Sequence, residues 1–357
     1  MSNSLVVKFG GDALATPERI AAAARRVVLR RRTHAVVAVA SARRGVTDHL
    51  LGLVEQVREA VPERGAPGPS VRAASDRAVA SGELVAASLL AVALGELGVG
   101  AVVLDAREAG LRSTGEAGGA SLTALRPARL ERLLARGLTP VVTGFQGWHR
   151  GRLTTLGRGG SDITAVALAG ALGAEGCELV KDPGALHTAD PRLVPEARPI
   201  AHADHRFVAE IALAGARIIH YVAAAQAERE AVPLRFTPLH GSGEPATEVG
   251  AGKGTAAFAV VLGDGHRGIL PEAGDAADVA TVSLVSASPD NRGPRAAAEA
   301  IVARAGVPVF RTVHREHAVG FLVPRTDGGR LLRMLHAMLG AGAAPLHRGE
   351  RMYASLG

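Results

Sequence analysis

The residues best suited to chemistry lie between positions 157 and 192, where a glycine turn, an acid and a second charged turn follow one another. Residues 157–162 read Gly-Arg-Gly-Gly-Ser-Asp, and residues 181–192 form the second charged stretch. Glycines let a backbone approach an anion closely, and the N-terminus of a helix adds N–H donors and a positive dipole end. The two stretches therefore predict two halves of one phosphate-handling site.

This interpretation requires a helix directly after the first turn. The stretch from Asp162 to Gly173 is rich in alanine and leucine and contains no proline, which predicts a helix ended by the glycine. Arg158 would then lie at the mouth of the helix. Two simpler alternatives stay open, because a glycine-rich turn can be ordinary loop chemistry and Asp162 can be a plain helix cap.

A second glycine turn lies near the start of the chain. Residues 5–9 predict a buried strand that runs into a Gly-Gly pair, and residues 17–32 predict a helix. Lys8 precedes these glycines and a third spaced glycine is missing, so neither the P-loop nor the dinucleotide-binding pattern applies. A lysine at the end of a core strand is costly to bury. We expect Lys8 to hold a transferring phosphoryl group, with a snorkelling edge lysine as the alternative.

Seven motifs, taken in order, resemble those of the aspartate kinases. They are found at Val7–Gly11, Ser41–Asp48, Ser81–Glu83, Thr143–Gly147, Gly157–Asp162, Thr188–Arg192 and Gly215–His220. The wider family is that of the amino acid kinases, and the resemblance implies an α/β fold, a three-layer αβα sandwich around a mainly parallel sheet. It also implies ATP-dependent phosphorylation of the side-chain carboxylate of L-aspartate to 4-phospho-L-aspartate, with ATP and Mg²⁺ as cofactors.

Phosphoryl transfer to a carboxylate needs cations that neutralise phosphate oxygens, and little covalent help. The resemblance assigns catalytic roles to Lys8, Asp162 and Arg217, with Asp162 orienting the two cations. It assigns the acidic amino-acid substrate to Ser41, Thr47, Glu83, Arg158 and Ser161, and the nucleotide to Gly10, Gly11, Lys181, Asp182, His187 and Arg192. A guanidinium suits a carboxylate, and a glutamate suits an ammonium group. Glu83 lies at a predicted helix start, where capping is its simpler role.

Several positions depart from the aspartate kinase pattern. The family usually has threonine at the position of Lys181, tyrosine at that of His187 and lysine at that of Arg217. Asp12 replaces a small hydroxylated residue, and its carboxylate would repel a phosphate unless Mg²⁺ or an arginine such as Arg44 neutralises it. These changes leave two alternatives open: a kinase for another acidic, amino-acid-like acceptor, and a non-catalytic, ligand-binding regulatory relative.

Composition sets broad limits on the function. The 357 residues suggest about two domains, and a hydrophobic content of 47% allows a sizeable core. The single cysteine, Cys177, excludes a disulfide framework and fits a reducing cytoplasm. The formal charge of +7 is spread along the chain without a basic stripe, so nucleic acid is not an expected partner. With no secretory leader and no apolar run of ~18 residues in view, we expect no membrane association.

The order of predicted elements divides the chain in two. Apolar runs alternate with helical stretches over residues 1–245 and predict a parallel α/β catalytic domain. A Gly-, Ser- and Thr-rich stretch at 241–256 follows, and the elements beyond it have the order strand, helix, strand, strand, helix of a ferredoxin-like module. They are expected at Val279–Ser286, Arg295–Ala305, Val307–Thr312, Ala318–Pro324 and Gly328–Leu339.

This C-terminal pattern resembles the last of the two ACT modules that end typical aspartate kinases. The resemblance implies a reduced regulatory region at residues 246–357, with one complete α+β, ACT-like domain at about 278–342. A homodimer through this domain is the expected assembly. Residues 256–270 resemble the remnant of a hairpin where the first module would stand.

Overall fold

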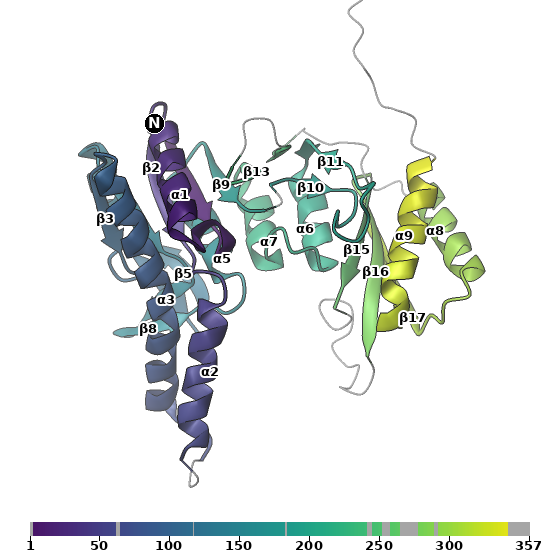
Figure 1. Ribbon diagram of the computed structural model, residues 1–357, viewed down its shortest axis with the longest axis horizontal. Helices are drawn as coiled ribbons and strands as arrows, with labels where there is room; N and C mark the ends of the chain where they lie inside the picture. The colour runs from purple at the N-terminus through teal and green to yellow at the C-terminus, as the bar shows by residue number, and fades with distance from the viewer. Residues whose placement is uncertain are drawn as a thin grey trace, which may run out of the picture. The chain divides into compact units, whose positions relative to one another are not determined.

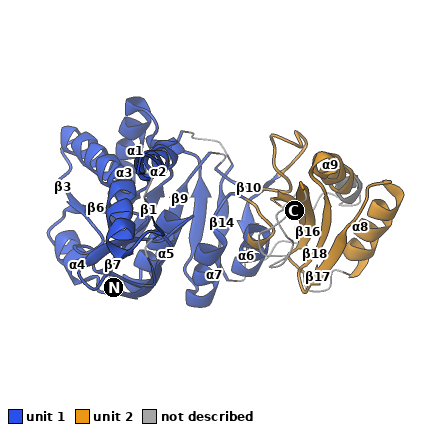
Figure 2. Cartoon of the chain, turned by 90° about the horizontal axis from the view of Figure 1, so that it is seen from below, with its two compact units in different colours: residues 1–186, 199–212, 217–255 blue, residues 187–198, 213–216, 256–357 orange. Residues whose placement is uncertain are grey.

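The computed structural model forms two compact units. It describes residues 3–61, 65–116, 118–182, 184–240, 245–251, 258–264, 278–288 and 292–341. The first unit contains residues 1–186, 199–212 and 217–255, and the second contains residues 187–198, 213–216 and 256–357 (Figure 2). The predicted boundary after residue 245 lies ten residues before the last switch between units. The two short segments 187–198 and 213–216 were expected in the catalytic domain, and the structure places them in the second unit.

An eight-stranded sheet is the centre of the first unit (Figure 1). In sheet order its strands are β12 (His202–Ala203), β14 (Thr247–Val249), β13 (Leu234–Thr237), β9 (Gly176–Val180), β1 (Ser4–Phe9), β2 (Ala35–Ala40), β6 (Thr139–Thr143) and β3 (Ala101–Leu104). The strands from β13 to β3 run parallel, and β14 runs antiparallel to β13. Phe9 lies beside Ala40 and Val180 in the register. The carboxyl ends of β1, β2 and β9 therefore meet at one edge, where open α/β sheets bind ligands.

Helices cover both faces of this sheet. They are α1 (Pro17–Arg30), α2 (Val46–Glu59), α3 (Pro69–Glu96), α4 (Ala128–Ala135), α5 (Gly160–Ala171), α6 (His205–Leu213) and α7 (Tyr221–Glu230), with a short 3₁₀ turn, η1, at Asp12–Leu14. Successive side chains of a strand point to opposite faces. On β1, Val7 and Phe9 join the core cluster built with α1 and α3, whereas Lys8 meets Asp162 of α5. This alternation confirms the predicted three-layer α/β fold.

A smaller sheet borders the long helix α3. Its strands, in sheet order, are β5 (Ser121–Leu125), β4 (Leu111–Thr114), β7 (Gln146–His149) and β8 (Arg152–Thr155). The buried carboxylate of Asp76 on α3 accepts a hydrogen bond from the Thr155 backbone N–H at 3.0 Å and another from its hydroxyl at 2.8 Å. The Gln146 amide donates to the carbonyl of Ala80 at 3.0 Å. These bonds join α3 to the small sheet, and α2 packs alongside α3 (Figure 1).

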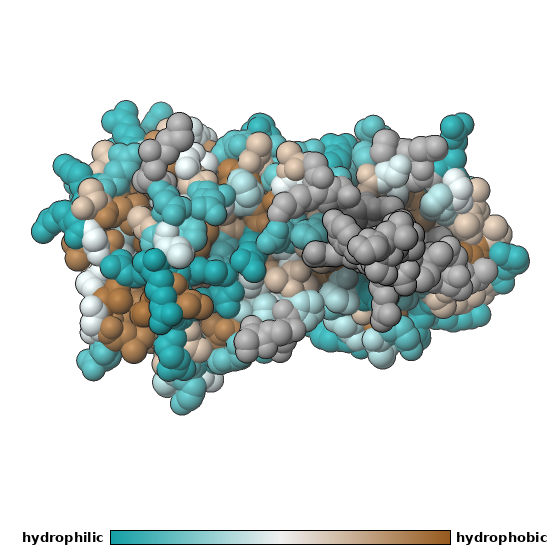
Figure 3. All heavy atoms as spheres, turned by 90° about the horizontal axis from the view of Figure 1, so that it is seen from above, coloured by the Kyte–Doolittle hydropathy of each residue, from teal (hydrophilic) through white to brown (hydrophobic). Residues whose placement is uncertain are grey.

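Helix α3 is long and apolar enough, by length and composition, to cross a membrane. From sequence we expect no such stretch, and α3 does contain the charged residues Arg72, Asp76, Arg77 and Glu83. A core helix of a globular protein passes the same test, and α3 buries Leu90 and Leu94 together with the charged Asp76 and Glu83. Its outer side keeps Val85 and Val92 exposed, and Figure 3 shows apolar side chains among hydrophilic ones on one face of the molecule.

The second unit is built on an antiparallel sheet with the order β15-β16-β18-β17. Its elements are β15 (Phe258–Gly263), β16 (Val279–Ser286), α8 (Arg292–Arg304), β17 (Arg311–Arg315), β18 (Ala318–Pro324) and α9 (Arg325–Ala341). The ferredoxin-like order is the predicted one, although β17 begins four residues later than expected. β15 lies in the predicted hairpin of residues 256–270 and pairs with β16, and residues 256–257 and 265–270 of that hairpin lie outside the described ones.

Two segments from the middle of the chain pack in this second unit. Ala189 and Val194 belong to its core cluster together with Leu331 and Leu335 of α9. Thr188 adds a hydrogen bond at 2.9 Å between its hydroxyl and the ring of His336. Two short strands, β10 (Leu186–His187) and β11 (Pro199–Ile200), lie where the chain leaves and re-enters the first unit. Burial of apolar residues in a different core therefore explains the assignment of residues 187–198.

The buried carboxylate of Glu178 on β9 offers a test of the first unit's stability. Arg30 Nε donates to it at 2.7 Å, Arg26 Nε at 2.9 Å and the Thr237 hydroxyl at 2.9 Å. Burial alone would raise the pKa of Glu178, but Arg30 and Arg26 hold it below its ordinary value. We expect Glu178→Gln to lower the free energy of unfolding at pH 7 by about 3 kcal/mol, because two partly buried guanidinium groups lose their buried counter-charge.

Urea unfolding followed by circular dichroism measures this loss. The control is Glu175→Gln, whose carboxylate is largely exposed and should change the free energy by less than about 0.5 kcal/mol. Because the pKa of Glu178 is lowered on folding, its stabilisation is present above the unfolded pKa of about 4.3 and disappears as the pH falls through the folded value. Equal unfolding free energies of the two variants at pH 7 would contradict the prediction.

Candidate active site

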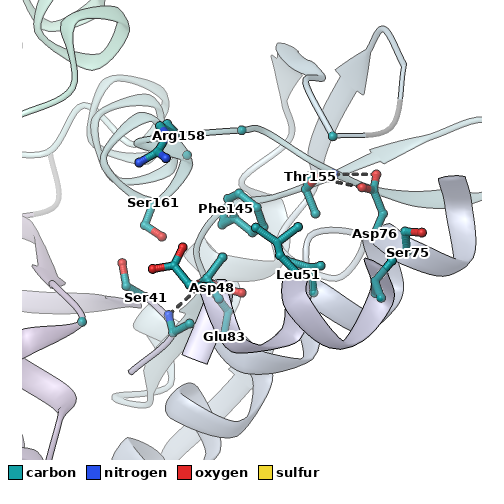
Figure 4. A pocket seen from close by; sticks show the side chains of 18 of the residues that line it. Ser41, Asp48, Leu51, Ser75, Asp76, Glu83, Phe145, Thr155, Arg158 and Ser161 are labelled. Carbon is teal, nitrogen blue, oxygen red and sulfur yellow. Dashed lines mark hydrogen bonds between the residues drawn. The ribbon is translucent and has the colours of Figure 1, made fainter. Parts of the chain in front are cut away.

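A cleft of about 670 Å³ opens in the first unit at the carboxyl ends of β1 and β2. It is bordered by α2, α3 and the N-terminus of α5. The predicted residues that line it are Lys8, Gly11, Ser41, Thr47, Glu83, Arg158, Ser161 and Asp162. Ser41 and Ser161 point into the same part of the cleft in Figure 4, with Arg158 at its border. The structure thus brings together every residue that the sequence reading assigned to the acidic substrate.

Three charged side chains form the centre of the site. Lys8 Nζ lies 2.7 Å from one carboxylate oxygen of Asp162, and Lys181 Nζ lies 3.0 Å from the other. The backbone N–H of His220 donates to the second oxygen at 3.2 Å. Burial alone would raise the pKa of Asp162, but the ammonium groups of Lys181 and Lys8 hold it well below its usual range. Asp162 is therefore an ionised carboxylate that fixes two cations.

Local backbone geometry explains how α5 presents Asp162. The helix begins at Gly160, two residues before the predicted start, so Asp162 is its third residue and Gly159 is the cap. Gly159 has φ of +73°, and a Cβ there would lie 2.1 Å from Cβ of His220. Only glycine satisfies both conditions. The turn therefore directs the positive end of the α5 dipole at the cleft, with Ser161 in the first turn.

Glu83 differs from its predicted position. It lies within α3, which begins at Pro69, so it does not cap a helix start. Its side chain is buried, with Oε1 accepting a hydrogen bond from the Ala42 N–H at 3.0 Å. Oε2 is buried as well and has no hydrogen-bond partner among the described residues. Burial raises the pKa of Glu83 to about 7, against the opposing effect of the Ala42 hydrogen bond.

The residues predicted to act on the nucleotide are distributed differently. Gly10 donates its N–H to the carbonyl of Val180 at 3.3 Å and so joins β1 to β9 next to Lys8. Asp182 is exposed and forms an ion pair with Arg19 of α1. His187 and Arg192 belong to the second unit, where the Arg192 guanidinium pairs with Asp190 at 2.7 Å. The structure therefore collects Gly10, Gly11, Lys181 and Asp182 in the first unit and the other two in the second.

The catalytic role of Arg217, the second predicted cation, stays a prediction. Arg217 is exposed in the turn that precedes His220, and the described residues that line the cleft do not include it. The cation that shares Asp162 with Lys8 is instead Lys181, which the sequence reading placed with the nucleotide. Lys181 follows β9, the direct neighbour of β1 in the sheet. Sheet order, which sequence alone does not reveal, brings the two lysines to the same carboxylate.

The predicted neutralisation of Asp12 is also visible. A guanidinium nitrogen of Arg44 lies 3.1 Å from Asp12 Oδ1, and Arg43 donates instead to the carbonyl of Ala15 at 2.6 Å. The Asp12 and Arg44 side chains are both more than half exposed. Solvent screens such a pair, so it reduces the local negative charge without adding much stability.

Sequence reasoning missed part of the cleft wall. Further lining residues are Asp48, Leu51, Ser75, Asp76, Phe145 and Thr155. In Figure 4, Phe145 and Leu51 stand between the Ser41 end of the cleft and a second polar end at Asp76. Asp48 and Phe145 lie inside motifs that resemble the aspartate kinases, which could have drawn attention to them. Asp76 had no such signal, because its partner Thr155 is 79 positions away.

Comparisons of the sequence give the family. A family model described as the amino acid kinase family matches residues 3–237. The aspartokinase of Corynebacterium efficiens is 32% identical over 348 residues, covering 94% of this chain and 77% of the relative. The aspartokinase of Thermus thermophilus is 35% identical over 232 residues, which are 64% of this chain and 55% of the relative. The chain spans about half the length of several of the curated relatives that it matches.

Solved structures agree with the fold. Aspartokinase III of E. coli in complex with aspartate and ADP superposes with a TM-score of 0.78 at 22% identity, covering 94% of this chain and 99% of the other. Aspartate kinase from Synechocystis superposes with a TM-score of 0.59 at 27% identity, covering 96% of this chain and 70% of the other. The family model matches most of this chain, and the similarity to the Corynebacterium efficiens protein extends over 94% of it, so this chain belongs to the amino acid kinase family and, within it, to the aspartokinases.

Proposed function

We propose that this chain transfers the γ-phosphoryl group of Mg·ATP to the side-chain carboxylate of L-aspartate, giving 4-phospho-L-aspartate and ADP. The observation that carries the proposal is the unpartnered, buried Oε2 of Glu83 in the same cleft as Lys8 and Arg158. A buried carboxylate oxygen without a partner is costly, and a ligand ammonium group would satisfy it. The cleft therefore offers an anion for the ammonium of an amino acid and cations for its carboxylates.

The acceptor side follows from these charges. Arg158 at the mouth of α5 would bind the α-carboxylate of the acceptor through its planar guanidinium, and Glu83 would bind the ammonium group. The hydroxyls of Ser41 and Thr47 would add hydrogen bonds. Held at both groups, the acceptor would direct its side-chain carboxylate toward Lys8. Binding in one orientation supplies a large part of the rate enhancement in reactions of this type.

The transfer itself requires little covalent chemistry from the protein. An ionised carboxylate oxygen of the acceptor attacks the γ-phosphorus, a new P–O bond forms, and the bond to the bridging oxygen of ADP breaks. The ammonium of Lys8, held by Asp162, would neutralise charge on the phosphoryl oxygens, and Ser161 in the first turn of α5 would donate to them. No proton has to move, because the attacking carboxylate is already ionised.

The nucleotide side is proposed from the remaining residues. Gly10 and Gly11 allow close approach of the phosphates after β1, and Asp182 follows Lys181 after β9. The roles of His187 and Arg192, which belong to the second unit, stay predictions from the resemblance. Mg²⁺ would enter as the Mg·ATP complex, since the described residues contain no group of three potential metal ligands and the nucleotide phosphates bind this ion well.

The direct test is ADP release with Mg·ATP and L-aspartate, with hydroxylamine present to trap the acyl phosphate as a hydroxamate. Hydroxamate formation that requires both substrates is the expected result. ATP binding without turnover on any acidic acceptor would overturn the proposal and favour a non-catalytic regulatory relative. The assay should include L-glutamate and L-2-aminoadipate, because the cleft continues past Phe145 to Asp76 and this extension favours a larger acceptor as the second candidate.

Glu83 gives this proposal a pH signature. Only ionised Glu83 binds an ammonium group, and burial raises its pKa to about 7. The KM for L-aspartate should therefore fall about tenfold between pH 6 and pH 8, as the ionised fraction of a group with this pKa rises. Glu83→Gln should raise KM and remove this dependence. Glu55→Gln, at another carboxylate of the cleft wall, should retain it, and an unchanged profile in Glu83→Gln would contradict the assignment.

The raised pKa of Glu83 also makes the stability of the folded state depend on pH. Substrate binding improves as the pH rises, whereas this contribution to stability decreases. A carboxyl whose pKa is raised on folding favours the folded state below its unfolded value, and this advantage is lost as the pH rises through about 7. Glu83→Gln should therefore unfold at no lower temperature than the parent chain at pH 8. An unfolding temperature at or above that of the parent chain would show that a raised KM in Glu83→Gln arises from substrate binding and not from folding.

The proposed assembly is a homodimer in the cytoplasm, formed through the ACT-like domain at about 278–342. A reduced regulatory region at residues 246–357 is proposed with it. The complete strand, helix, strand, strand, helix order of the second unit supports this assignment. Light scattering coupled to size-exclusion chromatography should give twice the mass of 36.5 kDa for the full chain, and the mass of one chain at micromolar concentration would overturn it.

A further inference from the structure

Two ammonium groups share a single carboxylate at the edge of the large sheet. Lys8 and Lys181 hold opposite oxygens of Asp162 at 2.7 and 3.0 Å. The side chains of Lys8 and Asp162 are 6% and 7% exposed, and that of Lys181 is 17% exposed. Two positive charges and one negative charge leave an excess of one positive charge, largely withdrawn from water.

The surrounding residues do not compensate this excess. In the part of the chain that the structure describes, Asp162 is the only carboxylate within ion-pair distance of either lysine. Glu178, the buried carboxylate of β9, is already engaged by Arg26 and Arg30. Burial lowers the pKa of Lys181, a direction that Asp162 opposes and Lys8 reinforces. A buried, unbalanced cation is costly, and an arriving anion would remove that cost.

The two lysines face different sides of the carboxylate. Lys8 lines the cleft together with Ser41, Glu83 and Arg158, where the acceptor is proposed to bind. The described cleft wall does not include Lys181, which leaves β9 directly before Asp182. Asp162 thus separates a cation on the acceptor side from a cation on the nucleotide side. In the proposed transfer, a nucleotide bound on the side of Lys181 would pass its phosphoryl group along both cations to the acceptor.

We propose that Lys181 is the second phosphate-binding cation of the transfer, contacting the γ-phosphate oxygens from the nucleotide side while Lys8 contacts them from the acceptor side. Arg217, the cation implied by the resemblance, is exposed and is not among the described residues that line the cleft. This inference rests on the proposed phosphoryl transfer. In that step the acceptor oxygen forms a bond to phosphorus, the bond to the ADP oxygen breaks, and Lys181 donates N–H groups without giving up a proton.

The test compares three variants of the full chain. Lys181→Met removes only the ammonium group, Lys181→Arg keeps the charge, and Arg217→Met removes a charge from the exposed position. With the hydroxamate assay, Lys181→Met should lower kcat by about 100-fold with KM for L-aspartate within about threefold, because the lost contact strengthens in the transition state. Lys181→Arg should recover part of kcat, and Arg217→Met should stay within about threefold of the parent chain.

Two outcomes would overturn the inference: a kcat in Lys181→Met within threefold of the parent, or an equal loss in Arg217→Met. Thermal unfolding controls for structure. Removal of Lys181 leaves Lys8 and Asp162 as a balanced pair, so the melting temperature of Lys181→Met should not fall. If Lys181→Met fails to fold, the kcat of Lys181→Arg tests the inference. This variant keeps the positive charge, so a folded Lys181→Arg without any activity would be incompatible with the proposed role.

Binding measurements separate this inference from the proposed function. Calorimetry with Mg·ATP and Mg·ADP reports the contribution of the γ-phosphate alone. Lys181→Met should weaken Mg·ATP binding about tenfold and Mg·ADP binding by less than twofold, since only ATP carries the contacted group. If the parent chain phosphorylates no acceptor, the proposed function fails, and this pair of affinities still decides the role of Lys181. If Lys181→Met kept the parent chain's preference for Mg·ATP over Mg·ADP, the proposed contact between Lys181 and the γ-phosphate would be wrong.

Discussion

Replacement of Lys8 by methionine should lower kcat for hydroxamate formation by about 10³-fold. Lys8 is the cation that lines the cleft and is held 2.7 Å from Asp162, so it is placed to neutralise charge that develops on the phosphoryl oxygens. A preorganised donor in a site shielded from water contributes more than the same group in solution, because it needs no reorganisation during the reaction. Methionine keeps the length of the side chain and removes only the charge.

The loss should arise in the chemical step and not in folding. Without Lys8, Asp162 keeps Lys181 as a partner, so a balanced buried pair remains and near-UV circular dichroism should be unchanged. Arg58→Met is the matched control, since Arg58 also lines the cleft but forms its ion pair with Glu55 on α2. Its kcat should stay within about threefold of the parent. Retention of a tenth or more of kcat in Lys8→Met would remove Lys8 from the proposed mechanism.

Replacement of Asp162 by asparagine should reduce the free energy of unfolding by about 3–5 kcal/mol and abolish hydroxamate formation. The substitution leaves Lys8 and Lys181 facing each other without a counter-charge, and loss of one partner from a buried ionic group costs this amount. Activity is lost with it, because both cations depend on Asp162 for their position. Urea unfolding at pH 7 measures the first effect.

The pH dependence and a double variant identify the cause. The pKa of Asp162 is lowered on folding, so its contribution is present above the unfolded pKa of about 3.9 and is lost as the pH falls through the folded value. The difference between parent and Asp162→Asn should therefore be constant above about pH 5 and shrink only in strong acid. Adding Lys181→Met to Asp162→Asn should restore part of the stability and none of the activity. Equal stability of parent and single variant at pH 7 would contradict the ionic account.

Local sequence patterns predicted the elements well where one periodicity dominates. The strand of residues 5–9 and the helix that starts at Pro17 are close to β1 and α1, and the ferredoxin-like order of the second unit was also found. Helix boundaries were less accurate. Asp162 and Glu83 were both placed at helix starts, whereas α5 begins two residues earlier and α3 begins at Pro69. The first residue of a helix depends on the backbone dihedral angles of its cap, and amino-acid composition does not specify those angles.

The sequence by itself determined the family, the layered α/β fold and the eight predicted residues that line the cleft, because motifs and hydrophobic periodicity are properties of short segments. Only the tertiary structure decided that Lys181 shares Asp162 with Lys8, that Arg217 stays outside the cleft, and that residues 187–198 belong to the second unit. It also decided that Glu83 titrates near neutrality. Ion pairing and desolvation depend on distances between residues far apart in the chain, and sheet order and burial set those distances.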